Sequence, residues 1–176
     1  IIYSTYQAVS GSGYKGVRDL EEGMKGNPPT NYPHPIYNNC LPHIDDFLDN
    51  GYTKEEEKMI NETRKILSKP ELKVTATTVR VPVFNSHSVS INIEFEKSFE
   101  MSEIFDELSK VENLVIVDDV KNNKYPMPID ATGSDSVFVG RIRRDFSVDN
   151  GINLWTVADN VRKGAASNAI QIAEKL

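Results

Sequence analysis

The spacing of apolar side chains along the chain predicts an alternation of strands and helices. Residues 1–9 are rich in isoleucine, tyrosine, threonine and valine, which favours a strand. After a glycine-containing turn, four apolar side chains at helical spacing predict a helix: Tyr14, Val17, Leu20 and Met24. A second helix is predicted to begin after Thr53, because Thr53 and Glu56 have the spacing of a capping box.

Long strands dominate the rest of the pattern. Residues 72–83 and 86–96 form two β-type runs, and the second alternates apolar with polar side chains, which predicts one covered face. Further elements are predicted in the order helix, strand, strand, strand and helix, over residues 102–108, 114–117, 136–146, 151–157 and 161–176. Asp159 has the position of an N-cap for the last helix.

Neighbouring long strands with no helix between them favour hairpins. We therefore expect the α+β class, with a mixed, mostly antiparallel sheet and helices packed on one face. Such a sheet exposes more apolar surface than one row of helices can cover, so we predict a homodimer through the sheet face. Residues 27–42 contain five prolines, which forbid a long helix or a central strand and indicate a functional loop or interface segment.

The 176 residues carry 20 Lys and Arg against 26 Asp and Glu, a formal net charge of −6. This acidic balance argues against binding to nucleic acid or to an anionic membrane, since both require a cationic surface. No apolar run reaches the ~18 residues that a membrane span needs. We therefore expect a soluble, cytoplasmic domain or one half of a larger enzyme. Because the chain opens on Ile1 within an apolar run, we expect a piece of a longer protein.

Several polar side chains could carry chemistry, and each also has an ordinary structural explanation. Glu55 and Lys58 share one face of the second helix, where they could hold a substrate amine and a phosphate or form a simple exposed ion pair. Arg80 suits bidentate capture of a carboxylate, and His87 suits proton transfer at neutral pH. A sheet-surface arginine and a structural histidine are the alternatives. Gln7, at the end of the first strand, needs hydrogen bonds from either backbone or ligand.

Other motifs are less specific. The turn Ser10-Gly11-Ser12-Gly13 leads into a helix N-terminus, where anions bind, but it lacks the full dinucleotide glycine pattern. Cys40 and His43 have metal-ligand spacing, yet Cys40 is the one cysteine, so we expect neither a metal site nor an intrachain disulfide. The acidic residues at positions 45 and 46 also argue against a catalytic thiolate at Cys40.

Four segments of the chain have an order and spacing that are typical of one enzyme family. They are Ser4-Thr5-Tyr6-Gln7-Ala8-Val9-Ser10-Gly11, Gly51-Tyr52-Thr53-Lys54-Glu55-Glu56-Glu57-Lys58, Arg80-Val81-Pro82-Val83 with His87, and Asp159-Asn160-Val161-Arg162-Lys163-Gly164-Ala165-Ala166. Over essentially the whole chain they resemble aspartate-semialdehyde dehydrogenase. The resemblance implies a substrate-binding and dimerisation domain over residues 1–176, with the fold of the carboxy-terminal domain of glyceraldehyde-3-phosphate-dehydrogenase-like enzymes.

The resemblance also implies a reaction. The family reduces β-aspartyl phosphate to aspartate β-semialdehyde with NADPH and releases phosphate, on the route to lysine, threonine, methionine and isoleucine. A cysteine of an Asn-Cys-Ser or Asn-Cys-Thr motif forms a thioacyl intermediate. That cysteine belongs to an amino-terminal NADP-binding domain, which is absent from this chain, and Cys40 does not match it.

Residue roles follow from the same resemblance. His87 would be the general acid/base, and Gln7 would orient the acyl group. Arg80 would bind the substrate α-carboxylate, while Glu55 and Lys58 would bind the amino group and the phosphate. The residues near NADP(H) would be Gly11, Ser12, Gly13 and Asn160.

Two alternatives remain open. One is a related acyl-phosphate reductase, such as an acetylglutamyl-phosphate reductase, and the other is a non-catalytic dimerisation module of the same fold. Glu55 argues against the first, because a free amino group on the substrate calls for an anion. Since the nucleophile is expected elsewhere, we predict that this chain alone has no dehydrogenase activity.

Overall fold

The computed structural model describes residues 1–174 and forms two compact units, Ile1–Phe84 and Asn85–Leu176. Each unit contains strands and helices, and each is described by itself. Within residues 1–174, none of the helices is both long and apolar enough to cross a membrane.

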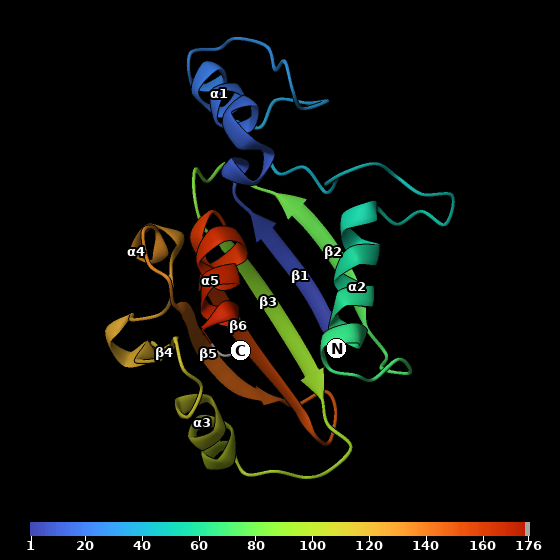
Figure 1. The fold of residues 1–176 in the computed structure, drawn as a ribbon, viewed down its shortest axis with the longest axis vertical. Coiled ribbons are helices and arrows are strands. Elements are labelled where there is room, and N and C mark those ends of the chain that lie inside the picture. Colours follow the sequence, from blue (N-terminus) through green and yellow to red (C-terminus); the bar gives the residue numbers. More distant parts are fainter. Residues whose placement is uncertain (175–176) are drawn as a thin grey trace. The chain divides into compact units, whose positions relative to one another are not determined.

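The first unit is built on two parallel strands, β1 (Ile2–Gln7) and β2 (Thr75–Arg80). A short 3-10 turn, Val9–Ser12, leads from β1 into helix α1 (Gly13–Met24). Helix α2 (Lys54–Ile66) runs beside β2, as Figure 1 shows. The predicted strand and both predicted helices of this part of the chain are therefore confirmed.

The start of α2 confirms the capping box that the sequence predicted. The Glu56 backbone N–H donates to Thr53 Oγ1 at 3.3 Å, and the Thr53 N–H donates to Glu56 Oε2 at 2.9 Å. Three consecutive glutamates occupy the first turn, where negative charge favours the helix macrodipole.

The proline-rich segment, residues 27–42, forms neither a helix nor a long strand, as predicted. Two of its apolar side chains, Ile36 and Leu41, pack with Val9 and Leu20 in one buried cluster. Leu41 also exchanges two backbone hydrogen bonds with Arg80, at 2.9 and 2.8 Å. The segment therefore folds back over α1 and the end of β2.

The second unit contains a mixed four-stranded arrangement in the order β3-β6-β5-β4. Its strands are β3 (His87–Glu94), β4 (Leu114–Ile116), β5 (Val137–Asp145) and β6 (Gly151–Ala158). The β3–β6 and β5–β6 pairs are antiparallel, and the short β4–β5 pair is parallel. Further helical segments are α3 (Met101–Ser109), η2 (Val120–Asn122), α4 (Pro128–Ala131), η3 (Arg162–Ala166, a π-helix) and α5 (Ser167–Ala173).

Helix α3 covers one face of this sheet. Alternate side chains of the strands form a core that includes Val139, Ile152 and Leu154, and α3 adds Ile104 and Phe105 to it. The α+β class, with a mixed sheet and packed helices, is confirmed. Among the strand pairs within the two units, the antiparallel pairs include more residues than the parallel pairs do.

Two details differ from the sequence predictions. Hairpin pairing holds for β5 and β6, whereas β2 pairs in parallel with β1. After β2 the chain is irregular, because Pro82 lacks a backbone donor and Ser86 has a φ of 71°. The last predicted helix begins as a π-turn, and its final residues, 175 and 176, lie outside the described residues.

Candidate active site

Four of the predicted site residues, one catalytic and three substrate-binding, meet near the carboxyl ends of β1 and β2. Gln7 and Arg80 are the last residues of these strands and lie opposite each other in the parallel register. Gln7 Nε2 donates to Glu55 Oε1 at 3.2 Å, and Lys58 Nζ lies 3.6 Å from Glu55 Oε2. The first unit therefore brings together Gln7, Arg80, Glu55 and Lys58.

Arg80 is a buried cation. It is 5% exposed, and its Nη1 donates to the Ala8 carbonyl at 2.7 Å. Among residues 1–174, its guanidinium has no carboxylate at ion-pair distance. Burial lowers the pKa of Arg80, whereas the nearby Tyr32 and Glu55 raise it. A guanidinium keeps its charge at neutral pH, so this site holds a desolvated positive charge that an anionic ligand would neutralise.

Glu55 and Lys58 form the ion pair that their i, i+3 spacing predicts. The Lys58 side chain is 58% exposed and the Glu55 side chain only 22% exposed. A pair of this kind contributes little stability by itself. The additional contact between Glu55 and Gln7 distinguishes it from an ordinary surface pair, since it directs the carboxylate toward the end of β1.

Glu56 has a tertiary role that its position in the sequence does not reveal. Its Oε1 accepts from the Thr78 backbone N–H at 2.9 Å, while its Oε2 makes the capping bond to Thr53. All three residues are buried. Glu56 therefore fixes the first turn of α2 against β2, two residues before Arg80. The capping box was visible in the sequence, but the contact with β2 exists only in the folded unit.

His87 and Asn160 approach each other in the second unit. His87 begins β3 opposite Ala158, the last residue of β6. Asn160 follows two residues later, and its Oδ1 accepts from the Ser86 backbone N–H at 3.0 Å. The predicted acid/base and one predicted cofactor residue thus lie close together, in a different unit from Arg80.

The Gly11–Gly13 turn belongs to the first unit, where it opens α1. The Gly11 N–H donates to the Ala8 carbonyl at 3.2 Å, and Gly13 has a φ of 66°, a left-handed conformation that favours glycine. The side chain of Ser12 makes no capping hydrogen bond at the start of the helix.

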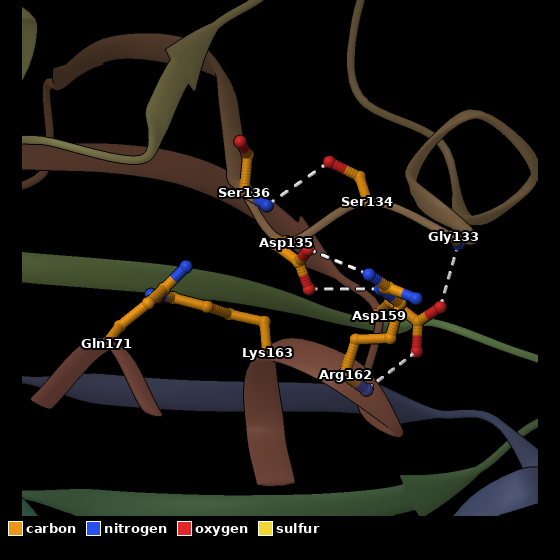
Figure 2. Close-up of polar contacts among 8 residues, drawn as sticks. All are labelled: Gly133, Ser134, Asp135, Ser136, Asp159, Arg162, Lys163 and Gln171. Atoms are coloured by element: carbon orange, nitrogen blue, oxygen red, sulfur yellow. Dashed lines mark hydrogen bonds and ion pairs between the residues drawn. The ribbon is translucent and has the colours of Figure 1, made fainter. Parts of the chain in front are cut away.

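Asp159 holds the segment that follows β6, as Figure 2 shows. It is 2% exposed, and its Oδ2 accepts from the Gly133 N–H at 2.8 Å. Its Oδ1 accepts from Val161 N–H at 2.9 Å and from Arg162 N–H at 3.2 Å, so it binds backbone donors as predicted, but the N-cap of the helical segment is Val161 and not Asp159.

A bidentate ion pair between Arg162 and Asp135 also stabilises the segment that follows β6. Arg162 Nε and Nη2 lie 3.0 and 2.8 Å from the two carboxylate oxygens of Asp135 (Figure 2). Hydrogen bonds from Arg162 and then from Ser167 lower the pKa of Asp135 to about 2. Lys163 also donates to Gln171 across the π-turn. These contacts fix the backbone on both sides of Asn160.

Cys40 is exposed and forms no disulfide. Residues 1–174 contain no cluster of three or more His, Cys, Asp or Glu side chains that could hold a metal ion.

Comparisons with known proteins agree with this arrangement. Residues 1–163 match the family model described as the semialdehyde dehydrogenase dimerisation domain. The chain belongs to this family. It is 50% identical over 183 aligned residues to the aspartate-semialdehyde dehydrogenase of Aquifex aeolicus, an alignment that covers 100% of this chain and 54% of that protein.

Solved structures of family members have the same fold. Vibrio cholerae aspartate semialdehyde dehydrogenase II complexed with ASA matches with a TM-score of 0.91 and 43% identity, over 98% of this chain and 53% of that one. The Candida albicans enzyme with NADP matches with a TM-score of 0.71 and 25% identity, over 98% and 48%. The resemblance to aspartate-semialdehyde dehydrogenase is thus confirmed, and the chain spans about half the length of these relatives.

Proposed function

We propose that this chain is the substrate-binding and dimerisation part of an aspartate-semialdehyde dehydrogenase. The complete enzyme would be a cytoplasmic homodimer that reduces β-aspartyl phosphate to aspartate β-semialdehyde in amino-acid biosynthesis. Family membership supports the reaction, and the family's description as a dimerisation domain supports the dimer. The net charge of −6 supports the absence of a nucleic-acid partner.

The main support for the proposed function is the burial of Arg80. Removing a guanidinium from water is costly unless an anion with matching geometry pairs with it. The α-carboxylate of aspartyl phosphate supplies that anion, and its two oxygens match the two-pronged donor of arginine. An exposed structural arginine would have no need of such a ligand, but Arg80 is 5% exposed.

The groups around Arg80 complement the rest of the same substrate. Glu55 provides an anion for the ammonium group, and Lys58 provides a cation for the phosphate. Gln7, at hydrogen-bond distance from Glu55, would orient the acyl group. An acyl phosphate with a free amino group is favoured over an N-acylated one, since the latter gives Glu55 no cation to bind.

His87 would act as the general acid/base, because an imidazole titrates near neutral pH. Its place at the start of β3, close to Asn160, supports a shared position beside the cofactor. NADPH supplies the hydride when it is bound. Gly11 and Gly13 are exposed and Ser12 is half-buried at the N-terminus of α1, where backbone N–H groups and the helix dipole favour the phosphate of a bound cofactor.

A chimera tests this function. In it, the present chain replaces the matching half of the Aquifex aeolicus relative. We expect NADP-dependent turnover of aspartate β-semialdehyde with phosphate, and we expect Arg80→Leu to lower kcat/KM by about 100-fold or more. Arg18→Leu, at an exposed position of α1, is the matched control and should leave kcat/KM unchanged. A folded chimera without turnover, or equal activity of both variants, would contradict the proposal.

The isolated chain provides a second test. Because the nucleophile is expected to lie outside residues 1–176, the purified chain should show no NADPH-dependent turnover. Catalysis by the chain alone, abolished by Cys40→Ser, would show that the assignment of the nucleophile is wrong.

A further inference from the structure

Tyr32 approaches the candidate active site from the proline-rich segment. Its hydroxyl lies 3.5 Å from the Val9 carbonyl, and Arg80 Nη1 lies 2.7 Å from the carbonyl of the preceding residue, Ala8. The phenol and the guanidinium therefore reach two consecutive carbonyls just after Gln7. Tyr32 is also close enough to raise the pKa of Arg80.

The position of Tyr32 is fixed by a buried carboxylate. Asp19, on α1, is 3% exposed. Its Oδ1 accepts from the Thr30 N–H and hydroxyl at 2.9 and 2.8 Å, and its Oδ2 accepts from Asn31 N–H and Tyr32 N–H at 2.8 Å each. These bonds preorganise the backbone that carries the phenol, so little entropy would be lost on binding a ligand.

Because Gly16 has no side chain, the Tyr32 hydroxyl can lie beside the Val9 carbonyl. A Cβ atom at this position would lie 2.5 Å from Tyr32 Oη and 2.5 Å from the Val9 carbonyl oxygen. Contacts that short do not occur, so any other residue at position 16 would displace the hydroxyl.

The hydroxyl itself is poorly satisfied. A distance of 3.5 Å is long for an O–H···O hydrogen bond, which is usually about 2.7–2.8 Å. An anionic oxygen held beside Arg80 would be a stronger acceptor than the Val9 carbonyl. The hydroxyl can turn toward such an oxygen by rotation about a single bond.

We propose that Tyr32 is a further substrate-binding residue, whose hydroxyl donates a hydrogen bond to the α-carboxylate held by Arg80. This inference rests on the proposed function. The segment of residues 27–42 thereby acts as a specificity loop, because its fold supplies a donor for one group of the substrate.

The test uses Tyr32→Phe in the chimera, which removes the hydroxyl and keeps the ring that packs on the Val9 cluster. We expect KM for aspartate β-semialdehyde to rise about tenfold, with kcat within about twofold. Tyr37→Phe, an exposed tyrosine of the same segment, is the matched control and should leave KM unchanged.

A substrate analogue distinguishes the loss of the Tyr32–carboxylate contact from a loss of protein stability. On 3-aminopropanal, which lacks the α-carboxylate, Tyr32→Phe and the unaltered chimera should have the same kcat/KM even if the variant is less stable, once values are scaled to folded enzyme. An equal loss on both substrates, or no rise in KM, would overturn the inference. Arg80→Lys is measured in parallel. If it lowers kcat/KM while Tyr32→Phe does not, the inference alone fails; if Arg80→Lys has no effect, the carboxylate site and the inference both fail.

Discussion

Gln7 donates a 3.2 Å hydrogen bond to Glu55 and so joins the end of β1 to the first turn of α2. The contact unites two residues that are 48 positions apart in the chain. It leaves a carboxylate beside a buried arginine, with Lys58 on the solvent side. Opposite charges are thus arranged for a ligand that itself carries both.

Glu55→Gln in the chimera should raise KM for aspartate β-semialdehyde by about 30-fold, because the substrate ammonium loses its counter-charge. The melting temperature should change little, since the amide can still bond to Gln7. Steady-state kinetics with calorimetry measure both quantities. Glu57→Gln, two residues further along α2, is the control, and an equal effect of both substitutions would contradict the role of Glu55.

Glu56→Gln should lower the free energy of unfolding and loosen the attachment of α2 to β2. Thr53 and Thr78 donate to different oxygens of Glu56, and glutamine replaces one of these oxygens by an NH2 group, so one buried donor loses its partner at a cost of about 1–3 kcal/mol. Denaturant unfolding measures the loss, and amide exchange should accelerate at Thr78 or at Thr53. Unchanged stability and exchange would show that Glu56 does not fix α2 to β2.

Asp19 predicts a dependence of stability on pH. Burial raises the pKa of Asp19, but backbone bonds from Tyr32, Thr30 and Asn31 together outweigh burial and hold the pKa below its usual 3.8. The folded state therefore gains stability above pH 3.8, and this gain is lost as pH falls through the lowered pKa.

Asp19→Asn should remove the stability that the ionised Asp19 carboxylate contributes. Its free energy of unfolding should be lower than that of the unaltered chain at pH 7, and the difference should shrink below pH 3.8. Urea unfolding at several pH values measures it. A difference that stays constant down to pH 2 would contradict the lowered pKa.

Local signals in the sequence were enough to predict most elements of the fold. The Thr53–Glu56 capping box and the helical spacing of Tyr14 to Met24 correspond closely to α2 and α1. Strand pairing was less predictable, because the parallel β1–β2 pair depends on contacts between residues about 70 positions apart. Alternation in a strand specifies its faces but not its neighbour.

The candidate site was also predictable only in part. Gln7, Glu55, Lys58 and Arg80 lie in segments with a recognisable family pattern, and the structure brings them together. Tyr32 lies in an irregular proline-rich segment without periodicity. Its approach to Arg80 depends on the buried Asp19 and on the missing side chain of Gly16, which only the folded chain makes visible.

A crystal structure of the chimera with aspartate β-semialdehyde would show directly whether Arg80 binds the substrate α-carboxylate. The substrate α-carboxylate should lie about 3 Å from the Arg80 guanidinium, with the ammonium on Glu55. Substrate bound with its carboxylate away from Arg80, or with Arg80 still bonded only to the Ala8 carbonyl, would show that Arg80 does not bind the carboxylate.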